Sequence, residues 1–271
     1  MRNNSNEYRP KKRFGQNFMK DQILREFVVN SAFIVKTDSV LEIGPGRGEL
    51  TGIIALRCPV EAIEIDRDLV RVLNARFNRN EKVKIIEGDV LAFDFKNIVA
   101  PKFKIIGNIP YNITTPIIFK ILENRHRIDS AVLTMQKEVA ERLSAGPGNK
   151  DYGVLTIMAG VFLSVEILKI IPAAAFFPAP NVDSAVIRIK PLEIPRVAVK
   201  DFDLFEKIVK TVFQQRRKNI KNGLLRVGIS KEATAKILAS CSIAGNSRPE
   251  DVSIEDFGRL AVFAGNENII G

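Results

Sequence analysis

The stretch Leu41-Glu42-Ile43-Gly44-Pro45-Gly46-Arg47-Gly48 places three glycines directly behind a short apolar run. Glycine lets the chain turn sharply and approach a ligand without obstruction by a Cβ atom. Glu64 follows Gly44 by 20 residues and ends the next apolar run, where a carboxylate can accept hydrogen bonds from both hydroxyls of a ribose. The pattern predicts a strand, a turn and a helix that bind an adenosine-type cofactor, and its GxGxG spacing requires no diphosphate.

Short apolar runs alternate with amphipathic segments on both sides of this turn. We expect strands at 39–43, 60–65, 83–86, 103–106, 131–135, 166–171 and 185–189, helices between the first five, and further helices at 21–33 and 154–162. This alternation is typical of an α/β fold with a doubly wound, mostly parallel, Rossmann-like sheet, whose ligands bind at the carboxyl ends of the strands. The last two strands have no helical span between them and are expected to close the edge as an antiparallel hairpin.

The C-terminal part of the chain has a different pattern. Residues 191–195 (Pro-Leu-Glu-Ile-Pro) break the alternation, and an apolar stripe at helical spacing follows at Phe202, Phe205, Ile208, Val209, Val212 and Phe213. Such a stripe is most simply the core of a small helical domain. We therefore expect a flexible basic segment at 1–20, a Rossmann-like domain at 21–192 and a helical domain at 193–271.

Positive charge is concentrated in two segments. Residues 1–20 hold six Lys/Arg against one Glu, and residues 200–226 hold eight against three acids, so each carries +5 of the net +10. Such clusters favour a polyanion, because neutralising phosphates releases counterions, although a solvated charged face is the alternative. The expected RNA-binding residues are Arg9, Lys11, Lys12, Arg13, Arg216, Arg217, Lys218 and Lys221.

Composition excludes several classes of protein. No apolar stretch reaches membrane-spanning length, and the N-terminus lacks the apolar core of a signal peptide, so we expect a cytoplasmic protein without a membrane partner. Cys58 and Cys241 lie 183 positions apart without a CxxC partner. They predict neither a metal site nor a disulfide framework and are expected to be small buried side chains.

The tetrapeptide Asn108-Ile109-Pro110-Tyr111 ends the apolar run 103–107. The exocyclic amine of adenine is a poor nucleophile, and an enzyme that methylates it must hold the nitrogen in line with the methyl donor. Asn108 offers a side-chain oxygen, the carbonyl of Ile109 is aimed by the restriction that Pro110 imposes on its backbone, and Tyr111 offers a ring for stacking. Together with the glycine-rich turn, these residues predict methyl transfer to an exocyclic amine.

An NAD-dependent dehydrogenase is the main chemical alternative. That chemistry calls for a proton relay, usually a His or Lys at the substrate, and the only histidine, His126, lies in the charged turn Arg125-His-Arg127. Methyl transfer from an activated sulfonium needs little acid–base help. The scarcity of histidine is therefore compatible with methyl transfer.

These motifs resemble, in order and spacing, the ribosomal RNA adenine N6,N6-dimethyltransferase family. The residues that carry the resemblance are Gln16-Asn-Phe18, Glu42 to Gly48, Asn108 to Tyr111, Phe177-Pro-Ala-Pro-Asn-Val-Asp-Ser184, Phe213-Gln-Gln-Arg-Arg-Lys-Asn219 and Arg248-Pro-Glu-Asp-Val-Ser253. They cover almost the whole chain. Pro45 and the segment Arg248 to Ser253 are similar to the branch that dimethylates two adjacent adenines of small-subunit (16S) rRNA; the other branch acts on large-subunit rRNA and confers antibiotic resistance.

The resemblance implies S-adenosylmethionine as cofactor and a role for each matching residue. Gln16 and Asn17 would line the cofactor pocket, Glu64 would bind the ribose, and Asp89, which follows the third predicted strand, would bind the cofactor adenine, although Asp after Gly is also a common turn. The complete expected cofactor set is Gln16, Asn17, Phe18, Glu42, Gly44, Gly46, Glu64, Ile65, Asp89, Val90 and Asn108. The expected catalytic set is Asn108, Ile109, Pro110, Tyr111 and Phe177, with Phe177 sandwiching the target base opposite Tyr111.

We thus expect an RNA methyltransferase that flips adenine into a pocket, linked to maturation of the small ribosomal subunit. Its partner would be small-subunit rRNA within a pre-ribosomal 30S particle, and it would act as a monomer. A large-subunit methyltransferase of the resistance type remains open, as does a ribosome-assembly factor whose catalysis is secondary.

Overall fold

A computed structural model describes residues 10–11 and 14–266 of the chain. They form two compact units, one comprising residues up to Ala140 together with Val165–Pro191, and the other Glu141–Ser164 together with the residues from Leu192 onward. The division differs from the expected one in residues 141–164, which belong to the second unit. Each unit is described by itself below.

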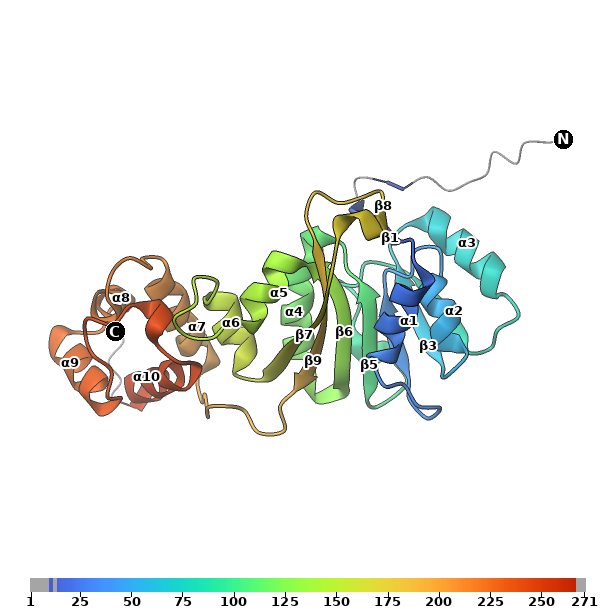
Figure 1. The fold of residues 1–271 in the computed structure, drawn as a ribbon. Helices are drawn as coiled ribbons and strands as arrows, with labels where there is room; N and C mark the ends of the chain where they lie inside the picture. The colour runs from blue at the N-terminus through green and yellow to red at the C-terminus, as the bar shows by residue number, and fades with distance from the viewer. Residues whose placement is uncertain (1–9, 12–13, 267–271) are drawn as a thin grey trace. The chain divides into compact units, whose positions relative to one another are not determined.

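A seven-stranded sheet forms the centre of the first unit (Figure 1). The strands are β2 (Val40–Ile43), β3 (Val60–Glu64), β4 (Val83–Glu87), β5 (Phe103–Asn108), β6 (Ile128–Gln136), β7 (Leu163–Ile171) and β9 (Ser184–Pro191), in the order β4-β3-β2-β5-β6-β9-β7. The pairs β4/β3, β3/β2, β2/β5 and β5/β6 are parallel, whereas β9 runs antiparallel to β6. The predicted mostly parallel α/β sheet is confirmed, and β9 inserts between β6 and β7.

The helices that accompany these strands are α1 (Gln22–Asn30), α2 (Glu49–Ala55), α3 (Arg67–Phe77), α4 (Thr114–Glu123) and α5 (Lys137–Ser144), which extends into the second unit. Helices α2, α3 and α4 connect parallel strands as predicted, but only a short 3-10 helix (Phe95–Asn97) lies between β4 and β5, where a helix was expected; α1 precedes β2 and α5 follows β6. Asp21 caps α1 by accepting from the Ile23 N–H, and Asp66 caps α3 by accepting from the Asp68 N–H. These caps satisfy backbone donors that have no partner within the helix. Helix α1 ends three residues before the predicted end, where Phe33 adopts a positive φ of 48°.

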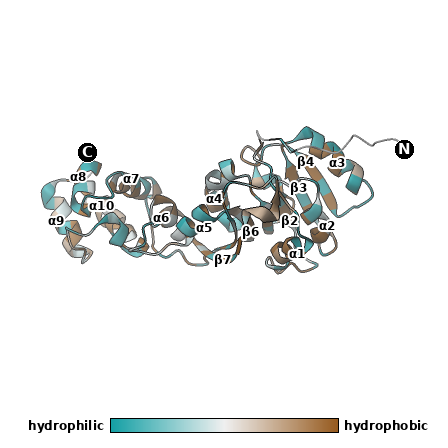
Figure 2. Cartoon of the chain, turned by 45° about the horizontal axis from the view of Figure 1, so that its top comes forward, coloured by the Kyte–Doolittle hydropathy of each residue, from teal (hydrophilic) through white to brown (hydrophobic). Residues whose placement is uncertain are grey.

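The core on one face of the sheet lies beneath α1 and α2. Its members share nearly complete burial and come from both helices and from every strand of the sheet except β4: Leu24, Val28, Val29, Leu50, Ile54, Val40, Val60, Ile106, Val132, Ile171 and Val186. Cys58 belongs to this cluster, and both cysteines are buried, as predicted. Figure 2 shows the hydrophobic residues concentrated in the strands, whereas the helices carry residues of both kinds.

A second, two-stranded sheet was not predicted. Strand β1 (Phe18–Met19) pairs antiparallel with β8 (Phe176–Phe177), with Phe18 opposite Phe177 and Met19 opposite Phe176. Both lie near the top of the first unit in Figure 1. Phe18 and Met19, which belong to the segment expected to be flexible, are therefore paired in a sheet, and the segment between β7 and β9 contains the short strand β8.

The second unit is helical. It contains α6 (Val154–Gly160), α7 (Phe202–Phe213), α8 (Ile220–Val227), α9 (Lys231–Ser240) and α10 (Ile254–Asn266). From Phe205 to Phe213 the predicted apolar stripe is buried, which confirms its role as the core. Within the part of the chain that the structure describes, no helix is long and apolar enough to cross a membrane.

Candidate active site and cofactor pocket

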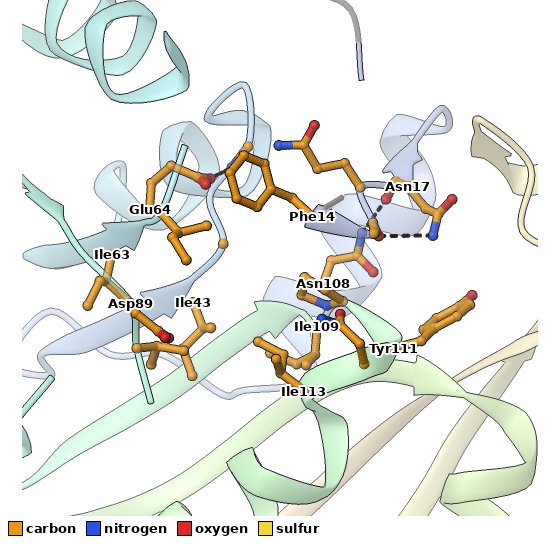
Figure 3. A pocket seen from close by; sticks show the side chains of 18 of the residues that line it. Phe14, Asn17, Ile43, Ile63, Glu64, Asp89, Asn108, Ile109, Tyr111 and Ile113 are labelled. Atoms are coloured by element: carbon orange, nitrogen blue, oxygen red, sulfur yellow. Dashed lines mark hydrogen bonds between the residues drawn. The ribbon is translucent and has the colours of Figure 1, made fainter. Parts of the chain in front are cut away.

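A cavity of about 330 Å³ opens at the carboxyl ends of β2, β3, β4 and β5 (Figure 3). Its wall includes twelve of the expected cofactor and catalytic residues: Gln16, Asn17, Gly44, Gly46, Glu64, Ile65, Asp89, Val90, Asn108, Ile109, Pro110 and Tyr111, with Ile43 and Ile63 as additional apolar contacts.

 Strand order brings together the residues at the ends of β2 to β5, because parallel strands end at one edge of the sheet. Gln16 and Asn17 reach the cavity from the segment before β1.

The glycine-rich turn forms one wall of the cavity. Gly44 and Gly46 have positive φ values of 66° and 60°, a conformation that favours glycine. A Cβ atom at Gly46 would lie 2.7 Å from Cε1 of Phe18. The ring of Phe18, an expected cofactor residue, therefore packs against the turn and does not line the cavity.

Glu64 ends β3 with its side chain in the cavity wall, and the residue is only 4% exposed. One carboxylate oxygen accepts from the Gly46 N–H at 3.1 Å and the other from the Asp66 N–H at 2.9 Å. Burial raises the pKa of this carboxyl group, while those two backbone bonds oppose the shift. Each oxygen keeps a lone pair, so the carboxylate can still accept hydrogen bonds from two vicinal hydroxyls.

Asp89 follows β4 and lies on the same wall. Its Oδ1 accepts from the Leu91 N–H at 2.8 Å, which is the turn geometry weighed above as the alternative. Its second carboxylate oxygen has no partner within the described part of the chain. Ile65 and Val90 line the same cavity with apolar side chains. A carboxylate beside apolar side chains suits an adenine ring with an exocyclic amine. Asp89 can therefore form this turn with one carboxylate oxygen and still bind an adenine amine with the other.

Asn108 ends β5 with its amide already oriented. Its Nδ2 donates to the backbone carbonyl of Asn17 at 2.6 Å (Figure 3). The donor side of the amide is thus engaged, which leaves Oδ1 as the acceptor. The neighbouring Ile109 donates its N–H to the Thr134 carbonyl at 2.9 Å, and no donor among the described residues reaches its own carbonyl. Two acceptors are therefore available side by side.

The two aromatic residues of the expected clamp have different environments. Tyr111 lines the cavity, and its hydroxyl lies 2.7 Å from Oγ of the buried Ser184. Burial raises the pKa of the Tyr111 phenol, and the contact with Ser184 opposes that shift. Phe177 does not line the cavity; it lies in β8 with 57% of its surface exposed. Its ring is free to meet a base that enters from solvent.

Glu42 is a third expected residue, after Phe18 and Phe177, that does not line the cavity, and Phe14 lines it although it was not expected. Glu42 is 1% exposed within β2 and contributes nothing to the cavity wall; burial raises its pKa to about 8. Phe14, which the sequence analysis did not single out, lies over the cavity near Glu64 (Figure 3). Its position two residues before Gln16 was the only signal that could have indicated it.

The expected RNA-binding residues are divided. Arg9, Lys12 and Arg13 lie outside the described residues. Lys11 forms ion pairs with Asp66 at 2.7 Å and Asp68 at 2.6 Å, which raise its pKa.

In the second unit, Arg216 donates to the carbonyls of Lys150 and Tyr152 at 2.7 and 2.6 Å and lies 3.6 Å from Glu250. It therefore anchors the loop before α6. The exposed residues that follow it, Arg217, Lys218 and Lys221, have no ion-pair partner within the described part of the chain. Their charges are available to a ligand.

Comparison with known proteins identifies the family. The sequence profile described as "Ribosomal RNA adenine dimethylase" matches residues 8–264. The chain is 41% identical over 256 residues to "Ribosomal RNA small subunit methyltransferase A" of Syntrophotalea carbinolica, covering 94% of this chain and 96% of the relative. It is 40% identical over 260 residues to the protein of the same name from Geobacter metallireducens, covering 93% and 94%.

Solved structures agree with this assignment. A dimethyladenosine transferase from Plasmodium falciparum is similar with a TM-score of 0.82 and 26% identity, covering 93% of this chain and 98% of that one. The 23S rRNA methyltransferase ErmE is similar with a TM-score of 0.73 and 27% identity, covering 91% and 99%. With the family profile spanning nearly the whole chain and the acceptor pair of Asn108 and Ile109 in place, the chain belongs to the ribosomal RNA adenine dimethylase family.

Proposed function

We propose that this protein transfers methyl groups from S-adenosylmethionine to N6 of two adjacent adenines in small-subunit (16S) rRNA and so takes part in maturation of that subunit. The observation that carries the proposal is the fixed amide of Asn108, whose Oδ1 is left as an acceptor, with the carbonyl of the next residue, Ile109, as a second acceptor. Two acceptors match the two N–H bonds of an adenine amine. Relatives at about 40% identity that are named as small-subunit methyltransferases support the choice of rRNA.

The cavity fits the cofactor. The buried carboxylate of Glu64 suits a ribose, and the carboxylate of Asp89 suits an adenine. The backbone at Gly44 and Gly46 allows a ligand to approach closely. When bound, S-adenosylmethionine supplies an activated methyl group. The protein then needs to exclude water and orient the amine, and neither task requires a strong base.

Asn108 and Ile109 hold the target nitrogen. Accepting both N–H bonds draws the amine's lone pair out of conjugation with the ring and directs it toward the cavity. As methyl transfer places positive charge on this nitrogen, the two oxygens stabilise it more strongly, which lowers the barrier. Tyr111 and Phe177 would stack on the two faces of the flipped base. Because β1 pairs with β8, Phe177 is tied to the strand that follows Asn17.

The RNA is held by charge as well as by the pocket. Arg217, Lys218 and Lys221 are proposed to contact phosphates, and Arg9, Lys12 and Arg13 remain predictions of the same kind. A pre-ribosomal 30S particle in the cytoplasm is the proposed substrate, with the enzyme acting as a monomer.

Labelled methyl transfer tests the proposal. Purified small and large ribosomal subunits that lack the modification are each incubated with the enzyme and methyl-labelled S-adenosylmethionine. We expect label in the small subunit alone, recovered as N6,N6-dimethyladenosine at two adjacent positions. Label confined to the large subunit would instead support the resistance type, the second candidate that the similarity to ErmE brings forward. A chain that binds small subunits but methylates neither would be an assembly factor.

A further inference from the structure

The start of β9 contacts the aromatic side of the candidate active site. Ser184 is the first residue of β9 and is completely buried. Its Oγ lies 2.7 Å from the hydroxyl of Tyr111, although the two residues are 73 positions apart in the chain. Figure 3 shows that this hydroxyl points away from Asn108. The hydroxyl of Tyr111 therefore holds its own ring in place and does not face the acceptor amide.

The central sheet fixes the position of Ser184 relative to the acceptor amide. Asn108 is paired with Thr134 across β5 and β6, and Ser184 is paired with Gln136 across β6 and β9. Thr134 and Gln136 are two residues apart on one strand, so a continuous ladder joins Asn108 to Ser184. Tyr111 itself lies in a short 3-10 turn that follows β5. The hydrogen bond to Ser184 therefore ties the ring of Tyr111 to the same rigid sheet that holds Asn108.

Asp183, directly before Ser184, closes the loop that carries Phe177. Its Oδ1 accepts from the Ala173 N–H at 3.1 Å, and its backbone carbonyl accepts from the Lys137 N–H at 3.0 Å. The first bond joins the two ends of the loop, and the second attaches the loop to the end of β6. Phe177 lies between the two joined ends, in β8. The loop of one aromatic residue and the ring of the other are thus anchored at adjacent positions of the chain.

We infer that Asp183 and Ser184 are positioning residues that set the separation of the two rings between which the target adenine stacks. Ser184 acts on Tyr111 through its hydroxyl, and Asp183 acts on Phe177 by closing its loop. The inference rests on the proposed function, because that function places adenine between these rings. A base held on both faces keeps its amine in line with the methyl donor only while both rings are fixed, since small displacements of a positioned group lower the rate of transfer.

A double-mutant cycle tests the contact between Ser184 and Tyr111. Ser184→Ala and Tyr111→Phe should each slow single-turnover methyl transfer to small ribosomal subunits by about 2- to 10-fold, the effect of one hydrogen bond, and leave S-adenosylmethionine affinity unchanged. The double variant should be no slower than either single variant, because both changes remove the same bond. Ser184→Thr keeps the hydroxyl and should transfer faster than Ser184→Val, which has the same shape without it.

Asp183 is tested against Phe177 in the same way. Asp183→Ala should slow transfer by a similar factor, and this loss should disappear in a Phe177→Ala background, where the loop no longer carries a ring. Asp183→Asn retains Oδ1 as an acceptor for the Ala173 N–H and should recover most of the rate that Asp183→Ala loses.

Asp129 and Ser130 provide matched controls, because they form the same dipeptide on the neighbouring strand β6. Ser130 is also buried, and Asp129 is also exposed, but neither residue lines the cavity. We expect Asp129→Ala and Ser130→Ala to transfer methyl groups at the wild-type rate.

Fluorine NMR reports on the ring of Tyr111 without any substrate. The chain contains three tyrosines, so labelling with 3-fluorotyrosine gives three resonances, and Tyr111→Phe identifies the resonance of Tyr111. We expect Ser184→Ala to shift and narrow this resonance, since the ring gains motion, and to leave the other two in place. Ser130→Ala should leave all three unchanged.

The outcomes separate the inference from the proposed function. If Ser184→Ala slowed transfer as much in the Tyr111→Phe background as in the wild type, or if the Tyr111 resonance did not respond, Ser184 would act only on the stability of the sheet. If Asp183→Ala remained costly without Phe177, Asp183 would not act through that ring. Each of these results overturns the inference and leaves the proposed function standing, whereas wild-type protein that transfers no methyl group to small subunits would overturn both.

Discussion

Substitution of Asn108 should separate the effect on methyl transfer from the effect on ligand binding. The Oδ1 of Asn108 is placed to interact with an amine whose positive charge develops only during transfer, so its loss should affect the rate more than the affinity. We expect Asn108→Ala to lower the single-turnover methyl-transfer rate by about 10² to 10³. Binding of cofactor and of the small subunit should change little, because Glu64, Asp89 and the basic residues are untouched.

Asn112→Ala is the control for this measurement. Asn112 lines the same cavity from the turn Tyr111–Ile113, and its loss should leave most of the rate intact. If Asn108→Ala transferred methyl groups at nearly the wild-type rate with saturating cofactor and subunit, Asn108 would not hold the target amine and the assigned catalytic centre would be wrong.

Glu42 makes the stability of the fold depend on pH. Burial raises the pKa of this carboxyl group in the folded chain to about 8 from its ordinary value of 4.5. Between these values the folded state holds a proton that the unfolded state releases, so this carboxyl lowers the free energy of unfolding as pH rises, by up to about 1.4 kcal/mol per pH unit. Below pH 4.5 both states are protonated and the contribution is constant.

Glu42→Gln removes this dependence. Urea unfolding between pH 5 and pH 8 should show a shallower fall of stability in the variant than in the wild type, with Glu26→Gln as the exposed-acid control. Parallel pH profiles for wild type and Glu42→Gln would mean that Glu42 is ionised in the folded protein and has a charged partner.

At the scale of single residues, the sequence predicted the site best where spacing carries the information. Glu64 lies at the end of a predicted strand and Asp89 follows another, and parallel strands bring their ends together, so both were found. Glu42 lies inside its strand, and the run of buried residues on both of its sides gave no sign of the direction of its side chain. Phe14 was missed because its contact with the cavity depends on a turn that no local pattern specifies.

At the scale of elements, the long periodic segments were predictable and the short ones were not. Strands β2 to β6 were recognised because each holds at least three apolar residues within a short run that is bounded by polar or turn-forming residues. Strands β1 and β8 have two residues each, and nothing but their pairing defines them. That pairing places Phe18 opposite Phe177, which joins the cofactor side of the site to its expected base-stacking side.

The contact between α7 and α8 provides a test at this scale. A Cβ atom at Gly223 would lie 2.8 Å from Cγ2 and 3.0 Å from Cα of Val212, so the helices approach closely only because this residue has no side chain. We expect Gly223→Ala to destabilise the second unit by about 1–3 kcal/mol, despite the higher helix propensity of alanine. Thermal unfolding measures the loss, and a gain in stability would show that α7 and α8 can separate at little cost.

Asn222→Ala is the neighbouring control for Gly223→Ala. Asn222 is exposed on the same helix, so the change gains helix propensity without adding a contact, and its stability should equal or slightly exceed that of the wild type.

At the scale of the whole molecule, the sequence predicted where positive charge is concentrated. It did not predict which of these charged side chains are already paired within the protein. Outside the two basic segments the chain has 27 bases (41 − 14) and 27 acids (31 − 4), so the excess is confined to them. Part of that excess is used within the protein, since Lys11 pairs with two carboxylates and Arg216 holds two carbonyls. Net charge thus overstates the number of contacts available to RNA.

Replacing Arg217, Lys218 and Lys221 together by alanine tests which charges reach phosphate. If all three do, rRNA affinity should fall and the slope of log affinity against log salt should flatten by about two to three units, because each lost contact removes nearly one released counterion. The fold should be unaffected, since these side chains are exposed.

Arg216→Ala provides the contrast. This change removes two hydrogen bonds from a charged donor whose side chain is 42% exposed, so we expect a loss of stability of about 1 kcal/mol, discounted for screening by solvent, and little change in salt slope. An unchanged slope in the triple variant, or a slope that responds to Arg216 alone, would move the phosphate-binding surface away from the segment between α7 and α8.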